Sequence, residues 1–537
     1  MHHCTSCKRD LPVYVVDTEI YRYLPSVVVG TLDKLAMIGL SDRFGALLGD
    51  VDCECTLHGF GRGMKCHERR APGHPRGTIV PLSSPLYDPS PTLEILDELH
   101  MVDEELGAFA GHYEGMLAVA QQELTRRQRS DGRAVRMKIV CTTATIEGED
   151  RQCEHLFGLP SVVVPLPGPT LRGSFYWQLR HDQPLRRFVG VLPHRATSEQ
   201  TMARILQSLH RSMRRLQRTG KTALPALTHI SDAEFSELVD LYRVSLTYVT
   251  SLVDFGKLRR TMESQVNEHI RSLGLEELKV RELSGDTAFD DVRATLEDLQ
   301  RREGETDAVI GTSMMSHGVD IDRLNVMLFS GMPKAMAEYI QASSRVGRTI
   351  LGVVFMIFNP VRERDRSHFR YHAKFHEYLE RMVEPVAINR WSRYAARKTM
   401  PGLLMAQFLQ VGNRDYWESG GAPRHLHDLT RAKEAIRPPN AGGIEAAQRE
   451  SILDSLSRAY FLERDGANEI RHEVTEDLDT ALGSLRVAGA AASVGARGRP
   501  TYRGTPDYLG LRFDPMLSLR DVAEGVPFIV LAPRRRS

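Results

Sequence analysis

The chain has 537 residues, too many for one hydrophobic core, so about two to four domains are expected. Hydrophobic residues make up 42% and charged residues 26%, and the longest apolar stretches, such as residues 351–358, are too short to cross a bilayer. The opening residues lack the pattern of a secretory signal, so the cytoplasm is the expected compartment and a membrane is not an expected partner. A formal net charge of +1 neither supports nor excludes nucleic-acid binding.

Short β-branched runs alternate with helical patterns as far as residue 360. They lie at 27–29, 93–96, 138–141, 188–192, 246–249, 308–310, 326–329 and 353–358. This alternation predicts parallel sheets of the α/β class. The Pro-rich segment at 164–180 predicts a linker between a first α/β domain, residues 1–163, and a second, residues 181–360. The strand pattern then fades, so residues 361–537 are predicted to be a mainly helical accessory region.

Five of the seven cysteines fall within the first 66 residues, which suits a metal site better than a disulfide framework. We expect a structural zinc held by Cys4, Cys7, Cys55 and Cys66, with His58 as the main substitute, because a Cys-x-x-His knuckle beginning at Cys55 would also fit. Closing the intervening loop costs about 3 kcal/mol, whereas a structural zinc contributes roughly 10 kcal/mol or more. This zinc would organise an insertion at about residues 50–70. Free thiols in a loop are the alternative.

The run at 93–96 is followed by Asp97-Glu98-Leu99-His100, at the strand end where open α/β sheets place ligand chemistry. One carboxylate there can hold the magnesium of a nucleotide, the next can orient and deprotonate an attacking water, and His100 can sense the phosphate state. Taken alone, these residues also fit the solvent-exposed start of a helix, with Asp97 or Glu98 as its N-cap.

The run at 138–141 leads into the hydroxyl-rich turn Thr142-Thr143-Ala144-Thr145. Ser- and Thr-rich turns are common because their hydroxyls cap the local backbone. This turn therefore indicates a functional motif only through its order and distance after Asp97. Farther on, the loop from Gly311 to Asp322 follows a strand and can approach a phosphate backbone, and Asp320 is placed to bind a ribose or the opposing domain.

The segment from Gln341 to Arg348 reads Gln-Ala-Ser-Ser-Arg-Val-Gly-Arg. We expect Arg345 and Arg348 to share one helical face and to reach across a cleft to a transferring phosphoryl group. A guanidinium in that position contributes about a thousandfold or more in rate. A basic helix end on the surface is the alternative, which the preceding Gly-x-Asp loop disfavours.

In this order and spacing, the segments resemble motifs of the superfamily 2 helicases of DEAD/DEAH type. Residues 97–100 resemble motif II, Thr143-Ala144-Thr145 motif III, residues 311–322 motif V and residues 341–348 motif VI. The resemblance covers residues 24–360 and implies tandem RecA-like parallel-sheet domains, the first truncated at its N-terminus, followed by a mainly helical C-terminal region. It also implies ATP and Mg²⁺ as cofactors, with Gly318, Asp320 and Gln341 binding the nucleotide.

The same resemblance implies a nucleic-acid path. Residues 30–35 resemble motif Ib, in which Thr31 and neighbours such as Lys34 hold the backbone of DNA or RNA. Residues 248–251 resemble motif IV, so Ser251, together with Thr312, is expected to bind nucleic acid.

A second resemblance concerns short segments after residue 360. Segments 375–378, 383–385, 390–395 and 517–522 are similar to the helicase of DISARM-type phage-defence systems. This similarity implies a bacterial enzyme acting on invading DNA with other defence-system subunits, namely methyltransferase and phospholipase-like partners. A helical bundle packing on the motor would explain the same apolar positions.

A motor of this kind begins with a Gly-rich loop ending in Gly-Lys-Ser or Gly-Lys-Thr, whose amides and Lys cradle the phosphates. No Gly-rich loop of this kind is found, and the Gly-rich segment at 495–500 has no Lys. We therefore expect the chain to start inside the first RecA-like domain because of a split gene, a misassigned start or a partner chain that supplies the loop. A non-hydrolysing nucleic-acid-binding scaffold and a zinc-containing DNA repair helicase remain alternatives.

Overall fold

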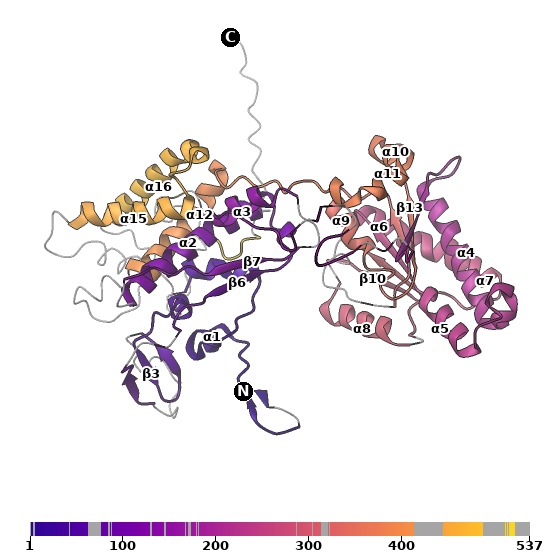
Figure 1. The fold of residues 1–537 in the computed structure, drawn as a ribbon, viewed down its shortest axis with the longest axis horizontal. Coiled ribbons are helices and arrows are strands. Elements are labelled where there is room, and N and C mark those ends of the chain that lie inside the picture. Colours follow the sequence, from indigo (N-terminus) through magenta and orange to yellow (C-terminus); the bar gives the residue numbers. More distant parts are fainter. Residues whose placement is uncertain are drawn as a thin grey trace, which may run out of the picture. The chain divides into compact units, whose positions relative to one another are not determined.

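The computed structural model divides the chain into two compact units (Figure 1). Unit 1 comprises Met1–Thr143, Gly148–Val162 and Val386–Ser537, and unit 2 comprises Ala144–Glu147 and Val163–Pro385. The structure describes residues 2–3, 6–41, 43–62, 77–83, 86, 88–128, 132–143, 147–166, 168–169, 173–178, 180, 182–285, 287–302, 304–312, 321, 323–412, 444–486, 511, 513 and 515–520. Within these ranges, no helix has the length and apolar character needed to cross a membrane.

Unit 2 is built on a six-stranded sheet in the order β10-β11-β9-β12-β13-β8, in which every neighbouring pair is parallel. The strands are β8 (Arg186–Val191), β9 (Ser245–Val249), β10 (Val280–Leu283), β11 (Ala308–Gly311), β12 (Val326–Ser330) and β13 (Gly352–Ile357). The predicted parallel strands at 188–192, 246–249, 308–310, 326–329 and 353–358 are thus confirmed. The sequence pattern did not reveal the edge strand β10, because Arg281 and Glu282 interrupt its apolar character.

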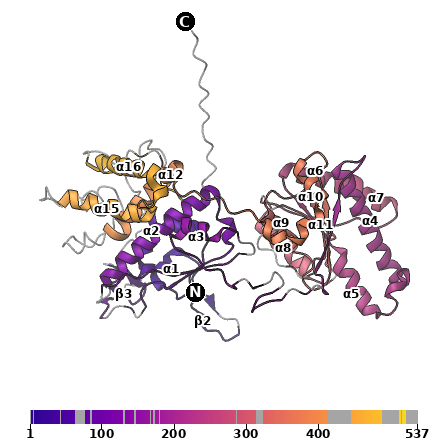
Figure 2. The ribbon, with the colours of Figure 1, turned by 45° about the horizontal axis from the view of Figure 1, so that its top comes forward.

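Helices cover both faces of this sheet (Figures 1 and 2). They are α4 (Ser198–Thr219), η4 (Gly220–Ala223), η5 (Pro225–Leu227), α5 (Asp232–Arg243), α6 (Leu252–Thr261), η6 (Met262–Asn267), α7 (Glu268–Ser272), α8 (Phe289–Gln300), α9 (Met336–Ser343), α10 (Glu363–Arg370), α11 (His372–Glu377) and η8 (Leu379–Met382). Alternate strand residues enter different cores: Tyr248 packs in the cluster that contains Tyr339 of α9, and Val249 in the cluster that contains Leu206 of α4. The central strands are therefore buried on both faces, as parallel strands between two helical layers require.

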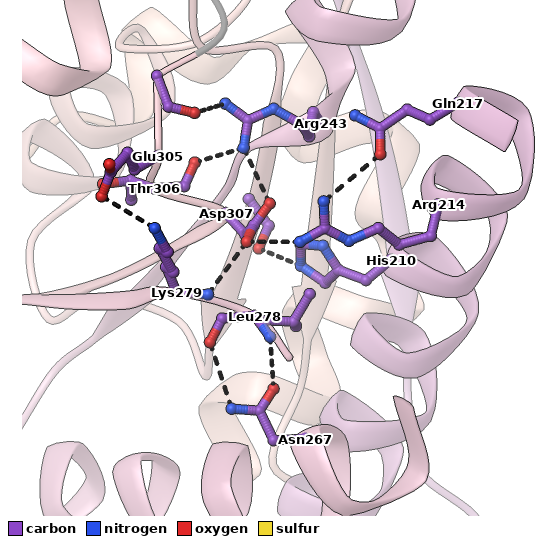
Figure 3. A network of polar contacts seen from close by, with 12 residues as sticks. His210, Arg214, Gln217, Arg243, Asn267, Leu278, Lys279, Glu305, Thr306 and Asp307 are labelled. Atoms are coloured by element: carbon purple, nitrogen blue, oxygen red, sulfur yellow. Dashed lines mark hydrogen bonds and ion pairs between the residues drawn. The ribbon is translucent and has the colours of Figure 1, made fainter. Parts of the chain in front are cut away.

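A buried ionic network lies at the amino ends of the strands in unit 2 (Figure 3). Asp307 directly precedes β11 and is almost fully buried. Its carboxylate accepts from Arg214 Nη2 and Arg243 Nη1, both at 2.8 Å, and from the Lys279 N–H at 3.0 Å. Two guanidinium groups and a backbone amide thus compensate one buried charge.

His210 of α4 borders this network, with its Nε2 2.9 Å from the Ser245 hydroxyl. Burial lowers the pKa of His210 to about 4, so the ring is neutral at physiological pH.

Unit 1 is organised around the long helix α2 (Glu104–Gln128), which is buried over most of its length. The other helices are α1 (Asp17–Tyr23), η1 (Leu32–Gly39), η2 (Phe44–Leu48), η3 (Leu99–Met101), α3 (Glu149–Phe157), α12 (Arg393–Ala406), η9 (Gln407–Gly412), α15 (Ile444–Tyr460), η10 (Asp465–Ala467) and α16 (Asn468–Arg486). Helices α3, α12 and α15 contact α2 directly. Gly115 permits the close approach of α15, since a Cβ at this position would lie 2.1 Å from the Ala459 carbonyl oxygen.

Helices make up most of residues 361–412 and 444–486, and the only strands among the described residues lie before residue 358. The residues from Val386 onward belong to unit 1, where Arg390 is fully buried and forms hydrogen bonds with several helices. The guanidinium donates to the carbonyl oxygens of His155, Gly111 and Ala459 at 2.5, 3.0 and 2.8 Å. Burial lowers the pKa of Arg390 to about 9.

The strands of unit 1 form small sheets. β6 (Leu93–Leu96) pairs in parallel with β7 (Lys138–Cys141); β3 (Cys53–Cys55) pairs antiparallel with β4 (Gly59–Gly61) and β5 (Ile79–Pro81); β1 (His2–His3) pairs antiparallel with β2 (Asp10–Leu11). The predicted strands at 93–96 and 138–141 are confirmed. The prediction of a strand at 27–29 is wrong: these three valines are exposed, and within the described ranges no strand pairs with them, so β-branching alone did not make a strand.

Candidate functional site

The carboxyl ends of β6 and β7 bring the candidate motifs II and III together in unit 1. Leu96 and Cys141 are register partners in the parallel pair, so Asp97 and Thr142 emerge side by side. The Thr142 hydroxyl donates to Asp97 Oδ1, and the Glu98 N–H donates to the same oxygen at 3.0 Å. Two strands separated by a 25-residue helix therefore fix one carboxylate.

His100 connects the two motifs a second time. Its Nδ1 lies 3.0 Å from Thr143 Oγ1 and 3.5 Å from Glu98 Oε2. The histidine side chain is 9% exposed, whereas that of Glu98 is 38% exposed, so the histidine is buried and the carboxylate it contacts is accessible. The one imidazole ring therefore contacts both Glu98 and Thr143. Ala144 and Thr145 lie outside the described residues.

The helix-capping alternative for these carboxylates does not match the geometry. Glu98 occupies the residue before η3, but its side chain makes no capping hydrogen bond, and its backbone is left-handed with φ 55°. A non-glycine residue in this region costs about 1 kcal/mol or more and is typical of functional turns.

A pair of carboxyl side chains includes a residue of β6, three positions before Asp97. Glu94 of β6 faces Glu114 of α2, and the two side chains share a hydrogen bond. Burial, and then the charge of Glu94, raise the pKa of Glu114 well above its ordinary value, while Arg136 opposes this shift.

Motif VI lies in unit 2 at the end of α9. The expectation that Arg345 and Arg348 share a helical face is wrong, because α9 ends at Ser343 and both arginines follow in a turn. Gly347 lies between them with φ 69°, and a Cβ there would lie 2.4 Å from the Leu185 carbonyl oxygen. The backbone at Gly347, not helical periodicity, therefore sets the directions of the two arginines. Gln341 is buried within α9.

Arg186 supports this turn and was not identified from the sequence. Its Nε donates to the Val346 carbonyl at 2.7 Å and its Nη2 to the Ser344 carbonyl at 3.2 Å. Burial, and then the charge of Arg348, lower the pKa of Arg186. The only sequence signal was an Arg-Arg pair at the start of β8, which is too common to indicate such a role.

The candidate nucleic-acid contacts of unit 2 follow the carboxyl ends of β9 and β11. Ser251 caps α6: its Oγ accepts from the Asp254 N–H at 3.1 Å and donates to Asp254 Oδ2 at 2.8 Å. Thr312 follows β11, with its N–H bonded to the Leu283 carbonyl at 3.2 Å. The remainder of the motif V loop, including Gly318 and Asp320, lies outside the described residues.

The motif Ib candidates are in unit 1. Thr31 directly precedes η1 and makes no side-chain capping bond. Lys34 forms an exposed ion pair with Asp17 at 2.9 Å. An exposed ion pair of this kind is weak, so Asp17 holds the Lys34 ammonium only loosely.

The structure describes only part of the predicted zinc site. Cys4 and Cys66 are outside the described residues, and Cys7 is exposed. Cys55 on β3 lies with its Sγ 3.1 Å from His58 Nδ1, a hydrogen-bond contact between the two residues of the proposed Cys-x-x-His knuckle. Among the described residues, no three His, Cys, Asp or Glu side chains gather closely enough to hold a metal.

One Gly-Lys-Thr tripeptide occurs in the chain, at Gly220, Lys221 and Thr222, without a Gly-rich loop before it. It forms η4 at the C-terminal end of α4, whereas a phosphate loop must open the N-terminus of a helix. Lys221 Nζ donates to the Ile230 carbonyl at 3.0 Å and pairs with Asp232 at the same distance. This tripeptide is therefore not a phosphate loop.

Comparison with known proteins identifies a family domain within unit 2. Residues 236–349, which include β9, β11, β12 and the motif VI turn, match the helicase conserved C-terminal domain. The chain is also 31% identical over 416 residues to the DISARM protein DrmA of Bacillus paralicheniformis. That alignment covers 75% of this chain but only 35% of DrmA, so the chain spans about a third of the length of this relative.

Two solved helicase structures are among the structural matches. The DUF1998 helicase MrfA bound to DNA is 18% identical with a TM-score of 0.42, covering 61% of this chain and 36% of that chain. The Mycobacterium smegmatis helicase Lhr bound to ssDNA and AMP-PNP is 12% identical with a TM-score of 0.38, covering 73% and 38% respectively.

Proposed function

The chain is a superfamily 2 helicase-family protein related to DrmA, and on this premise we propose that it forms part of an ATP-dependent DNA helicase or translocase of a bacterial phage-defence system. RNA is the alternative substrate, and other defence-system subunits in the cytoplasm are the proposed partners. The observation that carries the proposal is the double link between motifs II and III, through Asp97 with Thr142 and His100 with Thr143. A helicase needs such a link so that the bound nucleotide can change the affinity of the protein for the nucleic-acid strand.

Each motif residue has a proposed role in hydrolysis. Asp97 is a hard oxygen donor at a strand end and suits Mg²⁺, which when bound would neutralise charge on the phosphate oxygens. Glu98, the more exposed carboxylate, orients and deprotonates the attacking water. From unit 2, Arg345 and Arg348 stabilise charge on the γ-phosphate, and Gln341, Gly318 and Asp320 bind the nucleotide.

We propose that a phosphate loop from outside these 537 residues completes the site. Support comes from the open face of the β6 and β7 pair, where Leu93, Ile95 and Val140 are exposed. Strands of a parallel sheet are normally covered on both faces, so this apolar face suits further strands and helices of a RecA-like domain. That part can belong to the same polypeptide or to a partner chain.

A complementation assay tests this function. The 537-residue chain alone should show negligible ATPase activity, even with DNA, and should gain it when a segment with a Gly-x4-Gly-Lys-Ser/Thr loop is joined or added. Lys221→Ala is the matched control and should leave the restored rate unchanged, because this lysine is not a phosphate ligand. Restored ATP binding without any turnover would instead support the alternative of a non-hydrolysing scaffold. Robust hydrolysis by the chain alone would contradict the need for an added loop.

We also propose that nucleic acid binds through Thr31, Lys34, Ser251 and Thr312 by phosphate contacts, so affinity should fall steeply with salt and depend little on sequence.

A structural zinc held by Cys4, Cys7, Cys55 and Cys66 or His58 remains a proposal that the Cys55 and His58 contact supports. Protein purified without chelators should contain one zinc per chain, and its absence would refute this site. Such a metal would also fit a zinc-containing repair helicase, which shares the same motor chemistry.

A further inference from the structure

Three consecutive aromatic residues project from a short hairpin in unit 2. Gly173 and Gln178 form an antiparallel bridge, and the Ser174 N–H donates to the Trp177 carbonyl at 2.8 Å. The Tyr176 N–H donates to the Ser174 hydroxyl at 3.1 Å, which closes the turn. The tip therefore has a defined backbone, unlike the plain linker expected at 164–180.

The aromatic side chains on this tip are unusually accessible. Phe175 is 95% exposed, Tyr176 68% and Trp177 45%. The rings of Phe175 and Tyr176 pack edge to face, with centroids 5.1 Å apart and an interplanar angle of 83°. Since each such ring normally buries 150–250 Å², an exposed cluster of three indicates a surface that binds something with flat apolar faces.

The charge around the tip favours nucleic acid as the occupant. Residues 168–187 contain four arginines, at 172, 180, 186 and 187, and one acidic residue, Asp182. Arg180 and Arg187 are exposed, and Arg186 is the residue that supports the motif VI turn. Aromatic rings beside arginines form the usual platform for single-stranded nucleic acid, in which bases stack on the rings and phosphates pair with the cations.

We infer that the hairpin at 173–178 is a base-stacking site for single-stranded nucleic acid, with Phe175 and Tyr176 as the principal stacking residues. This inference rests on the proposed function and adds a contact to bases, whereas Thr31, Lys34, Ser251 and Thr312 would contact phosphates. Arg186 lies eight positions after Gln178, a span of at most about 28 Å of extended chain, so the stacking site is tethered to the motif VI turn.

The test compares two probes on the full chain: a 20-nucleotide oligothymidine and an abasic oligonucleotide of equal length. Phe175→Ala with Tyr176→Ala should weaken oligothymidine binding about tenfold or more while leaving abasic binding and the salt slope unchanged. Phe175→Tyr with Tyr176→Phe should retain the affinity. Tyr371→Ala removes a different exposed aromatic of unit 2 and is the matched control, expected to change neither probe.

Trp177 provides a direct readout, because its emission should be quenched by oligothymidine and not by the abasic strand. Equal losses on both probes, or no loss on either, would overturn the stacking site while leaving nucleic-acid binding intact; the second result would point to a protein partner. Failure of the unchanged chain to bind either probe would instead overturn the proposed function.

Discussion

In unit 2 the six parallel strands form the core: β9 and β11 are buried along their whole length, and helices cover both faces of the sheet. In unit 1 the core is helical: α2 is enclosed by α3, α12 and α15, while β6 and β7 form a pair that turns alternate side chains outward. Motif II nevertheless keeps a defined geometry on this two-stranded support. Among the described residues, the strand end that carries Asp97 and Glu98 is thus held by one neighbouring strand, β7, through Thr142 and Thr143.

The two units also differ in how they compensate a buried charge. In unit 2 Asp307 is bonded to two arginines, whereas in unit 1 Arg390 is bonded only to carbonyl oxygens and stacks on Phe461 at 3.7 Å. A carboxylate with two cations forms a coupled ionic unit, so removing the carboxylate alone leaves an excess of buried positive charge. The network of Figure 3 should therefore be sensitive to the loss of Asp307.

Replacing Asp307 gives the largest expected change in stability. Asp307→Ala removes the carboxylate shared by Arg214 and Arg243, leaving Asp240 at 3.5 Å as the remaining anionic partner of Arg243, and should lower the free energy of unfolding of unit 2 by about 3–5 kcal/mol. Hydrogen exchange of β9 and β11 peptides in urea measures this. Glu237→Ala, which removes an exposed partner of Arg302 in the same unit, is the control and should cost less than about 1 kcal/mol. Similar losses for the two variants would contradict the distinction between buried and exposed pairs.

The next largest effect is the pH dependence at His210. Because burial depresses its folded pKa to about 4, the unfolded state takes up the proton first as pH falls below about 6.5. The stabilisation is therefore present above pH 6.5 and is lost between pH 6.5 and 4, amounting to about 3 kcal/mol. His210→Gln should reduce the slope of unfolding free energy against pH in this window, measured by urea titration. The exposed His472→Gln should leave it unchanged.

The smallest expected effect is at Lys34 in unit 1. Lys34→Ala should change stability by less than about 1 kcal/mol, because its ion pair with Asp17 is exposed. It should nevertheless reduce the slope of log affinity for DNA against log salt by about one unit, since one phosphate contact is lost. Lys221→Ala is the control. An unchanged slope would remove Lys34 from the proposed nucleic-acid path.

Strand positions in both units were predictable because buried parallel strands are short, continuous apolar runs such as Val326–Ser330. The same rule failed at Val27, Val28 and Val29, where residue type is right for a strand but no described neighbour pairs with it. It also missed β10, an edge strand whose charged residues face solvent. The residue types of a short segment indicate whether it is buried. Whether the segment forms a β-strand depends on a pairing strand that is distant in sequence.

Asp97, Glu98 and His100 could be singled out from the sequence because they form a contiguous motif. The contacts that position these residues could not be predicted, because Thr142 and Thr143 join them across more than 40 positions. Arg186 approaches the motif VI turn from about 160 positions away, and Gly347 sets the arginine directions through one backbone angle. Neither effect leaves a periodic signal in the sequence.

The most direct test of the central claim, that motif II in this chain activates water for ATP hydrolysis, is the turnover of Glu98→Gln in the protein completed with a phosphate loop. The amide cannot accept the water proton but keeps nearly the same shape, so the rate should fall by about a thousandfold while ATP affinity stays near that of the unchanged protein. Single-turnover hydrolysis and nucleotide binding measured on the same preparation separate these two quantities. Turnover indifferent to Glu98→Gln would contradict the claim and favour a scaffold that binds nucleic acid without hydrolysis.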